Sequence, residues 1–383
     1  EGKLGGPQVR MLRVGAALGR RAETLIVMPR ANSGPFREMC AAHGVAYRTL
    51  PLTRITKEWR AALAYLLFSP WEVLRLARLF RRERIDLVHA SGGSWQYKAV
   101  IAARLAGVPS VWHLNDTCTP GWVRRVFALV QPLATGFTYD SHRAKAYYSP
   151  YITGDRVSAI IPPPVSVAEF DPSAPRSDDG LPGDYFNGDP VIGTVGNVNP
   201  IKGLETLIRA AARLRALGHT PHVVIVGPVF DRQRGHHRRL LALAGELGVD
   251  RLHFVGARAD VRPLLARFDV YVCCSASESW GMALWEAMAM ARPVVSTDVG
   301  DVARHVTDGE AGFIVPVGDA EAMAGRIARL LDDPALRARM GRAARTAVAP
   351  FTPERIATAT LDFYRRILST GDRRCTPPPE EPR

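Results

Sequence analysis

The sequence is poor in cysteine and has no long apolar run. Its 383 residues include five cysteines, which form no Cys-x-x-Cys pair and no spaced set with histidines, so reduced thiols are favoured over a metal site or a disulfide framework. No apolar run approaches the length of about 18 residues that spans a membrane. The chain starts at Glu1 rather than at Met, and its start gives no information about export.

Three ligand-binding motifs are also absent. Neither half of the chain contains Gly-x-Gly-x-x-Gly or a P-loop, so simple NAD or ATP binding has no support from a motif. The chain also lacks Asp-x-Asp, a pair of carboxylates that can hold a metal–diphosphate complex. We therefore expect neither a bound cofactor nor a metal.

The composition is that of a globular protein, but the charge is uneven. With 47% hydrophobic and 23% charged residues, the chain is long enough for two domains. Residues 1–180 contain 24 Lys+Arg and 14 Asp+Glu (24 minus 14 gives +10), whereas residues 181–383 contain 26 and 23. This excess indicates an anionic partner for the first half: a membrane surface, a phosphorylated acceptor or nucleic acid. Arginine usage in a GC-rich genome is the alternative explanation.

Residues 56–84 combine aromatic and apolar side chains with arginines. Arg75, Arg78 and Arg82 recur at helical spacing, and we expect Pro70 to divide the segment into two short amphipathic helices. A basic face beside an aromatic–apolar face suits an interfacial helix on anionic lipid. A packed helix with a solvated arginine face is an equally good interpretation.

Strand-like apolar runs alternate with helical patterns in both halves, which predicts an α/β fold with parallel sheets covered on both faces. Expected strands are residues 24–28, 85–89, 108–113, 135–139, 157–161, 191–195, 222–226, 252–255, 269–273, 293–297 and 312–315. Expected helices are residues 8–18, 95–106, 122–133, 202–217, 236–247, 261–267, 284–291, 319–332, 335–348 and 353–369. In the helix at 202–217, the i, i+3, i+4, i+7 spacing predicts a buried face made of Leu204, Leu207, Ile208 and Ala211. We predict domains at 1–165 and 191–350, a Pro/Gly-rich linker at 166–190, a C-terminal helix at 351–370 and a disordered tail at 371–383.

The stretch from Glu278 to Glu286 lies between a strand pattern and a helical pattern that starts at Leu284. Such a junction presents backbone N–H groups and the positive end of a helix dipole to an anion. Gly281 allows close approach to the backbone, and the two glutamates can accept hydrogen bonds from hydroxyls. This combination suits a ligand with a phosphate end and a polyhydroxyl end, such as a nucleotide-sugar. Helix capping or solvation is the alternative role for the glutamates.

Two further features lie where parallel sheets bind ligands. The segment from Val195 to Gly203 connects a strand to a helix, as a phosphate-binding loop does, and carries Lys202. His89 and His113 fall at the carboxyl ends of expected strands. A solvated lysine and structural histidines are the alternatives.

The Glu-x7-Glu pattern, followed by Ala287-Met288-Ala289 and the run from Arg292 to Gly300, resembles the signature of retaining GT-B glycosyltransferases of family four. The resemblance covers about residues 190–335 and extends more loosely over the rest. It implies two Rossmann-like domains that face each other across a cleft, with the acceptor bound by the first and the nucleotide-sugar by the second. It also implies a last helix that crosses back onto the first domain, and transfer of a hexose-type unit with retention.

The resemblance assigns roles to residues of this chain. Glu278 would hold the sugar hydroxyls, Glu286 the ribose, and His113 would lie beside the donor sugar. The donor diphosphate would be bound by Lys202 and by the backbone N–H groups of Gly281, Met282 and Ala283. Gly6 belongs to a glycine turn that relatives place near the donor phosphates, although the strand that should precede this turn is missing. A simple surface turn is an equally good interpretation of these glycines.

The chain departs from the family pattern at Asn197, where relatives usually carry an arginine five residues before the lysine. Lys202 is therefore expected to carry an unusually large share of the diphosphate charge. Arg258 or Arg304 could instead supply the missing cation.

The implied acceptor is a lipid-linked glycan, a cell-surface glycan or a small glycoside. The implied location is the cytoplasm, with peripheral association with the inner face of the cell membrane. A nucleotide-sugar epimerase and a glycogen-type synthase are alternatives on the same fold. A basic nucleic-acid-binding protein is the alternative of another class, but no helix-turn-helix, RNA-binding or zinc pattern supports it, so no nucleic-acid partner is expected.

Overall fold

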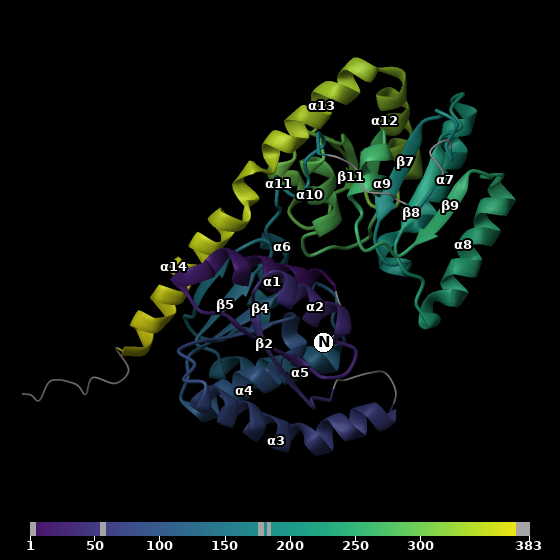
Figure 1. Cartoon of the computed structure of the whole chain (residues 1–383). Coiled ribbons are helices and arrows are strands. Elements are labelled where there is room, and N and C mark those ends of the chain that lie inside the picture. The colour runs from purple at the N-terminus through teal and green to yellow at the C-terminus, as the bar shows by residue number, and fades with distance from the viewer. Residues whose placement is uncertain (1–4, 54–58, 175–179, 182–184, 373–383) are drawn as a thin grey trace, which may run out of the picture. The chain divides into compact units, whose positions relative to one another are not determined.

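The computed structural model describes residues 5–53, 59–174, 180–181 and 185–372. The chain divides into two compact units (Figure 1). Unit 1 comprises Glu1–Pro164 and Pro353–Arg383, and unit 2 comprises Val165–Thr352. The last helix therefore belongs to the same unit as the start of the chain.

Unit 1 contains two parallel sheets. The two-stranded sheet pairs β1 (Leu25–Pro29) with β2 (Ala46–Leu50). The four-stranded sheet has the order β3-β4-β5-β6, with bounds Val88–Ser91, Ser110–Leu114, Gly136–Tyr139 and Val157–Ile160. Every residue of strands β4 and β5 is buried, as expected for a parallel sheet covered on both faces.

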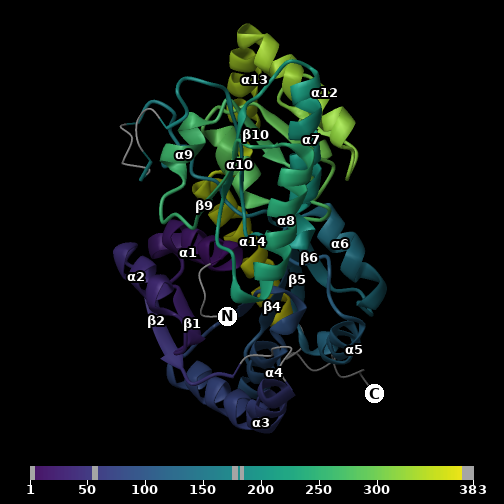
Figure 2. The same cartoon turned by 90° about the vertical axis from the view of Figure 1, so that its right-hand side faces the viewer.

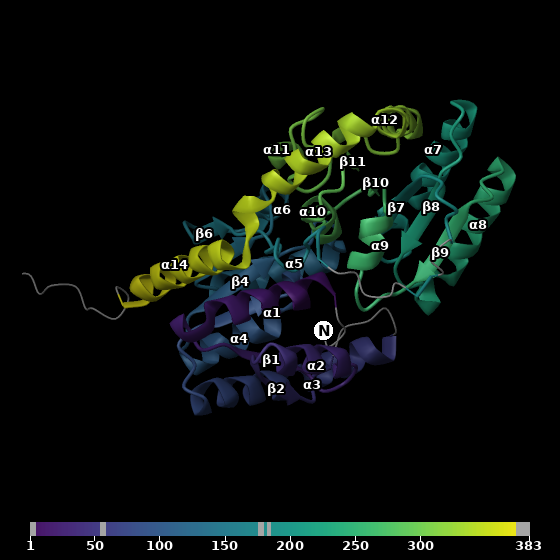
Figure 3. The ribbon, with the colours of Figure 1, turned by 45° about the horizontal axis from the view of Figure 1, so that its top comes forward.

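Helices cover both faces of the unit 1 sheets. Helices α4 (Tyr97–Ala106), α5 (Gly121–Val130) and α6 (His142–Tyr148) connect successive neighbouring strands of the four-stranded sheet, so right-handed crossovers place all three on one face. Helix α3 (Trp59–Arg82) connects the two sheets and packs against α4. Figure 2 shows α3 and α4 side by side in this layer, where their apolar residues share one cluster. The other helices are α1 (Gly6–Leu18), α2 (Gly34–Ala42) and α14 (Pro353–Asp372). Helix α14 packs along α1 and against β6 (Figure 3).

Unit 2 is built on one six-stranded parallel sheet with the order β12-β11-β10-β7-β8-β9. The chain starts in the middle at β7 and continues outward through β8 and β9, then returns to the other side of β7 for β10, β11 and β12. The bounds are Val191–Val195, His222–Val226, Leu252–Gly256, Val270–Cys273, Val294–Thr297 and Phe313–Val315, in chain order from β7 to β12. The direction of strand addition thus reverses between β7 and β10, and ligands bind at such a reversal in open α/β sheets.

Two apolar clusters hold the unit 2 helices on the sheet. One cluster includes α7 (Leu204–Ala216), α8 (Arg234–Leu247) and α12 (Ala320–Asp332). The other includes α9 (Arg262–Arg267), α10 (Met282–Ala289), α11 (Val302–His305) and α13 (Pro334–Ala347). The buried face predicted for α7 from its i, i+3, i+4, i+7 pattern is confirmed, since all four of its residues are buried: Leu204, Leu207, Ile208 and Ala211.

The prediction that Pro70 divides residues 56–84 into two helices is wrong, because α3 runs through it without interruption. A proline inside a helix removes one backbone hydrogen bond and costs about 3 kcal/mol. Here α3 is buried on both sides of the proline, through Tyr65 before it and through residues Val73, Leu76, Ala77 and Phe80 after it. Tertiary packing of this kind outweighs local propensity. The pair α2 and β2 was not anticipated from the sequence.

The segment expected to be a linker groups with unit 2 from Val165 onward. Val165, Phe170 and Phe186 are buried in the core of that unit, so the described part of residues 166–190 packs as part of the domain. The expected disordered tail lies outside the described residues, except for the last residues of α14. No helix in the described part of the chain has the length and apolar character to cross a membrane.

Four histidines, two in each unit, have a lowered pKa. Burial lowers the pKa of His89 and of His113 in unit 1. In unit 2, His222 Nδ1 lies 2.8 Å from His253 Nε2, and burial and the positive charge of Arg251 lower the pKa of both rings. All four rings therefore favour the neutral form.

These buried histidines predict a loss of stability in mild acid. Below the ordinary histidine pKa of 6.5, the unfolded chain takes up protons that the folded chain does not. The free energy of unfolding should be highest above pH 6.5 and should fall as the pH drops from 6.5 toward the lowered pKa values. Urea unfolding at a series of pH values measures this slope. His253→Gln should make the slope shallower, whereas His43→Gln, an exposed residue, should not; a flat profile in wild type would contradict the prediction.

Candidate functional site

The reversal of strand direction in unit 2 brings two loops together. The loop after β7 contains Lys202, and the loop after β10 contains Glu278. The amide of Ala276 donates to the carbonyl of Ile201 at 2.8 Å, and the thiol of Cys274 lies 3.1 Å from the carbonyl oxygen of Lys202. Lys202 and Glu278 are 76 positions apart in the sequence, and their loops are thereby joined through the backbone at the carboxyl ends of neighbouring strands.

Gly203 makes this close approach possible. Its φ of +61° lies in the left-handed region, and a Cβ at this position would lie 2.1 Å from the carbonyl oxygen of Cys274. A side chain here would push the loop that carries Lys202 away from the loop that carries Glu278. The glycine is therefore needed for both the turn and the contact.

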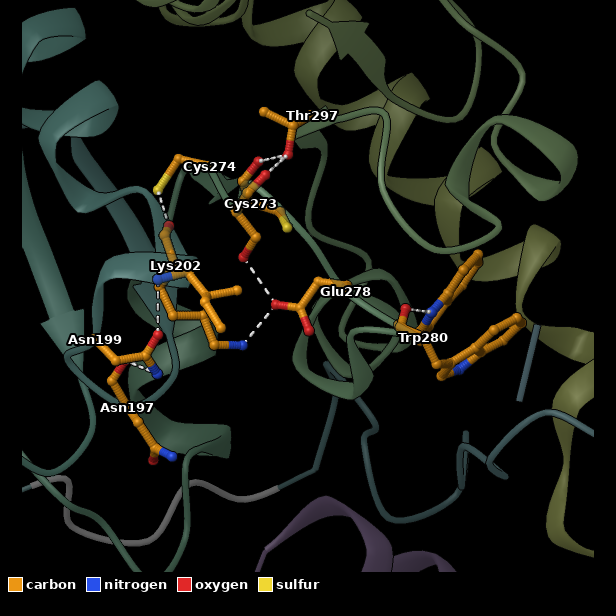
Figure 4. A network of polar contacts seen from close by, with 11 residues as sticks. Asn197, Asn199, Lys202, Cys273, Cys274, Glu278, Trp280 and Thr297 are labelled. Atoms are coloured by element: carbon orange, nitrogen blue, oxygen red, sulfur yellow. Dashed lines mark hydrogen bonds and ion pairs between the residues drawn. The ribbon is translucent and has the colours of Figure 1, made fainter. Parts of the chain in front are cut away.

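Lys202 and Glu278 form an ion pair between the two loops. The Nζ of Lys202 lies 2.6 Å from Oε1 of Glu278, and the side chains are 27% and 16% exposed. Ser275 is buried, and its hydroxyl donates to the same oxygen at 2.8 Å. Figure 4 shows the second carboxylate oxygen of Glu278 pointing away from both donors. The pair thus leaves one carboxylate oxygen and a partly exposed ammonium group for a ligand.

The electrostatics of the pair keep Lys202 charged. Burial lowers the pKa of Lys202, but attraction to the Glu278 carboxylate and the hydrogen bond between them outweigh burial, so the pKa is raised. Lys202 therefore remains an ammonium group at neutral pH. A permanent cation beside a carboxylate can bind a ligand that carries both an anionic group and hydroxyl groups.

The N-terminus of α10 lies just after Glu278 in the chain. Gly281 takes the left-handed conformation with φ of 77° at the N-cap, and α10 begins at Met282. The first-turn N–H groups of a helix, here those of Met282 and Ala283, have no acceptor within the helix. Glu286 lies one turn further along α10 and is partly exposed. Four of the residues predicted to bind the donor therefore lie at or near this helix end: Gly281, Met282, Ala283 and Glu286.

Two tryptophans support the loop from its inner side. The rings of Trp280 and Trp285 stack with centroids 4.6 Å apart, and the indole N–H of Trp285 donates to the carbonyl of Trp280 at 2.9 Å. Both rings are buried against Phe351. Because this packing fixes the backbone on either side of Gly281, it also fixes the position of Glu278.

Asn197 is exposed, and Figure 4 shows its side-chain amide pointing away from the Lys202–Glu278 pair. Asn199 has a structural role, because its side-chain oxygen accepts from the amide of Ile201 at 3.0 Å and so caps the short turn that ends at Lys202. Of the arginines considered as a replacement cation, Arg304 is exposed on α11 and Arg258 is partly exposed in the loop after β9. A role for either arginine as the replacement cation stays a prediction.

His113 lies at the end of β4 in unit 1 and is completely buried. Its Nε2 lies 2.6 Å from Asp140 and its Nδ1 lies 2.9 Å from the hydroxyl of Thr138. A carboxylate only accepts, so the neutral ring donates from Nε2 and accepts at Nδ1. Asp140 also faces Arg10, whose Nε lies 3.5 Å away. In this conformation His113 presents no free ring nitrogen, and its contact with a donor sugar stays a prediction.

Gly6 is the first residue of α1 and is exposed, with Gly5 as the N-cap. The first strand that the structure describes is β1, which follows α1. The predicted proximity of Gly6 to donor phosphates therefore also stays a prediction.

Sequence reasoning missed the residues that hold Glu278 in place. Ser275 bonds its carboxylate, and the hydroxyl of Thr297 donates to the carbonyl of Ser275 at 2.7 Å. The spacing of Ser275 and Glu278, three residues apart in one loop, is the signal that could have indicated the contact. Thr297 comes from β11 and could not have been paired with this loop without the sheet order. Among the described residues, no group of three or more His, Cys, Asp or Glu side chains could hold a metal ion.

Comparisons with known proteins agree with this geometry. Residues 184–347 match the family model "Glycosyl transferases group 1", and residues 5–142 match the model "Glycosyl transferase 4-like domain". The solved structure of HepE from Anabaena, in complex with UDP and glucose, is similar with a TM-score of 0.78 at 21% identity, over 95% of this chain and 97% of HepE. This similarity confirms the predicted fold.

The chain is also similar to proteins that are named as glycosyltransferases. A lipopolysaccharide core biosynthesis glycosyltransferase, LpsE of Rhizobium meliloti, is 37% identical over 47% of this chain and 50% of LpsE, so the match spans half of that relative's length. A D-inositol 3-phosphate glycosyltransferase of Stackebrandtia nassauensis is 30% identical over 73% of this chain and 68% of the relative. Together with the matched family models, these relatives show that the chain belongs to the glycosyl transferases group 1 family and is a glycosyltransferase with the GT-B fold.

Proposed function

We propose that this enzyme transfers a hexose-type unit from a nucleoside-diphosphate sugar to an acceptor hydroxyl, with retention of configuration and without a catalytic metal. The observation that carries the proposal is the Lys202–Glu278 pair beside the N-terminus of α10, with N–O distance 2.6 Å. An ammonium group and a helix N-terminus suit the diphosphate, and a carboxylate suits sugar hydroxyls. Both ends of such a donor thus find complementary groups within one unit.

The chemical step then depends on the departing phosphate. The bond between the sugar C1 and the diphosphate oxygen breaks, and a bond from C1 to the acceptor oxygen forms on the same face of the sugar. The acceptor proton passes to the departing diphosphate, so Glu278 and Glu286 need not act as the nucleophile and acid of a glycoside hydrolase. Lys202 and the N–H groups of Met282 and Ala283 stabilise the negative charge as it develops, which is the largest electrostatic task of the step. Glu286 accepts hydrogen bonds from the ribose.

The nature of the donor is supported by the HepE complex, which contains UDP and glucose. The acceptor class is supported by LpsE, a lipopolysaccharide core enzyme, and by an enzyme that acts on D-inositol 3-phosphate. We propose a lipid-linked or cell-surface glycan, or a small glycoside, as acceptor. An acceptor linked to lipid would place the enzyme in the cytoplasm, peripherally on the inner face of the cell membrane.

A nucleotide-sugar epimerase and a glycogen-type synthase use the same fold and would use the same donor-binding groups. They differ in product. An epimerase returns an altered sugar without transfer to an acceptor, and a glycogen-type synthase extends a glucan primer. Nucleic-acid binding is favoured by net charge alone.

A donor screen tests the proposed function directly. UDP-, GDP- and ADP-sugars should be compared for release of the nucleoside diphosphate, first with water and then with candidate glycan acceptors, and the anomeric configuration of the product should be determined by NMR. We expect release from one donor, retention in the product and full activity in EDTA. Inversion would refute the mechanism, and loss of activity in EDTA that Mg²⁺ or Mn²⁺ restores would refute metal independence. If no donor is consumed, and the protein shifts a random DNA duplex in an electrophoretic assay at physiological salt, nucleic-acid binding would be favoured instead.

Lys202→Ala should weaken both donor binding and turnover. A charge-assisted contact contributes about 1.5–3 kcal/mol to binding, and a donor at a preorganised anion site about 2.7–4 kcal/mol to the transition state. The substitution also leaves the Glu278 carboxylate unpaired beside the diphosphate. We expect kcat/KM to fall on the order of a hundredfold or more, while Lys145→Ala, an exposed lysine of unit 1, should have no effect.

Calorimetric titration of the nucleoside diphosphate extends this test to Asn197. Asn197→Arg should tighten binding, because it restores the second cation of the family pattern. Weaker binding would instead indicate that Arg258 or Arg304 already occupies that position. Unchanged affinity in Lys202→Ala would remove Lys202 from the site.

Ser275→Ala should lower turnover without weakening diphosphate binding. The Ser275 hydroxyl fixes the carboxylate that we assign to the sugar, and a hydrogen bond to a charged group contributes about 1.5–3 kcal/mol. We expect kcat to fall at least about tenfold while the affinity for the free nucleoside diphosphate stays unchanged. Thr346→Ala, which removes an exposed helix hydroxyl of unit 2, is the matched control. Equal losses of affinity and turnover would point to a collapse of the loop rather than to a positioning role.

A further inference from the structure

Three neighbouring helices of unit 1 expose large apolar side chains to solvent. On α3, the exposed fractions are 68% for Leu67, 55% for Phe68, 55% for Trp71 and 42% for Leu74. Helices α4 and α5 lie next in the same layer, as Figure 2 shows for α3 and α4, and expose Leu105, Trp122 and Leu129. We call the solvent side of α3, α4 and α5 the three-helix face.

The outer stripe of α3 changes from apolar to basic along the helix. Leu67, Trp71 and Leu74 lie at helical spacing, and Arg78 and Arg82 continue the same stripe, with Arg75 between them. The guanidinium of Arg75 lies 6.0 Å from the ring centroid of Trp71, so the two halves of the stripe are in contact. The exposed arginines of the three-helix face are Arg75, Arg78, Arg81, Arg82, Arg104 and Arg125.

The three-helix face presents no acidic side chain to solvent. Glu72 is the single acidic residue in the sequences of α3, α4 and α5. It is 2% exposed and forms a buried ion pair with Lys98, while the amide of Thr53 donates to its second oxygen at 2.6 Å. Its charge is thus neutralised in the interior, and the outer surface carries arginines without opposing carboxylates.

Among its described residues, unit 2 lacks such a concentration. Its exposed large apolar residues are scattered one to a segment, at Ile201, Leu217, Phe230, Leu241 and Val317. Isolated apolar residues are ordinary on a protein surface, whereas a group of them rimmed by one sign of charge marks an interaction site. The contrast assigns the site to unit 1.

We propose that the three-helix face docks the enzyme onto an anionic lipid bilayer, a step that rests on the proposed function because it brings the enzyme to a lipid-linked acceptor. Apolar and aromatic side chains enter the boundary between headgroups and acyl chains, while arginines bind lipid phosphates. Nucleic acid would satisfy the arginines but would leave Leu67, Phe68, Trp71 and Leu129 exposed to water. The combination of both chemistries therefore commits the face to lipid.

Flotation with vesicles tests the proposal on the full chain. Wild type should float with vesicles of phosphatidylcholine and phosphatidylglycerol, bind pure phosphatidylcholine far less, and lose binding as salt increases. Each arginine near an anionic surface contributes about fivefold, so Arg75→Gln/Arg78→Gln/Arg82→Gln should weaken binding about a hundredfold. Phe68→Ser/Trp71→Ser and Trp122→Ser/Leu129→Ser should each weaken it about tenfold. Because these side chains are exposed, the variants should unfold at the wild-type denaturant concentration.

Matched variants in unit 2 provide the control. Leu217→Ser/Leu241→Ser removes two exposed apolar side chains, Arg238→Gln/Arg239→Gln removes two exposed arginines, and both variants should float like wild type. Three outcomes would overturn the proposal. The first is an equal loss of flotation in the unit 1 and unit 2 variants, and the second is unchanged flotation of Trp122→Ser/Leu129→Ser. The third is displacement of the enzyme from vesicles by random duplex DNA while the apolar variants float like wild type. Flotation needs no catalysis, and release of nucleoside diphosphate with water as acceptor needs no membrane. Failure of one assay therefore leaves the other informative.

Discussion

The contact between the loop after β7 and the loop after β10 is the constraint on which the proposed donor site depends. Strand addition in unit 2 reverses at these two strands, so their loops meet at the carboxyl edge without a covering helix between them. The contact is backbone to backbone, through Ala276 and Ile201, and needs a glycine at position 203. Lys202 and Glu278 come together as a consequence of this geometry rather than through any preference of their side chains.

The ion pair that results has a second physical consequence. Without a ligand, the ammonium group and the carboxylate neutralise each other, and neither is left as an uncompensated, partly buried charge. In the proposed mechanism, a diphosphate that reaches Lys202 would compete with Glu278 for the cation, and the sugar hydroxyls of the donor would donate to the carboxylate that is released. Because Ser275 and the stacked Trp280 and Trp285 hold the loop, the carboxylate changes partners without having to change place.

The sequence was sufficient for the parts of this structure that depend on local pattern. Period and spacing predicted the alternating strands and helices, the buried face of α7, and the placement of Lys202 and Glu278 in strand–helix loops. They were insufficient where distant contacts decide the outcome. Pro70 lies within a continuous helix because packing on both sides of it outweighs the lost hydrogen bond, and His113 is enclosed by Thr138 and Asp140 from the neighbouring strand and its loop. Thr297 could be connected to Ser275 only through the order of β10 and β11 in the sheet.

Net charge is the weakest of the sequence signals, and the structure explains why. The first half has a charge excess of +10 (24 minus 14), in which every arginine has the same weight. Arg10, which is 2% exposed and lies beside Asp140, therefore contributes as much to this number as each arginine on the outside of α3. A buried arginine cannot attract a distant partner, because its charge is balanced inside the unit. What distinguishes a lipid surface from nucleic acid is therefore not how many arginines the unit contains. It is the exposed apolar row of α3, which continues into the arginines on one helix face and which only a partner with an apolar interior can cover.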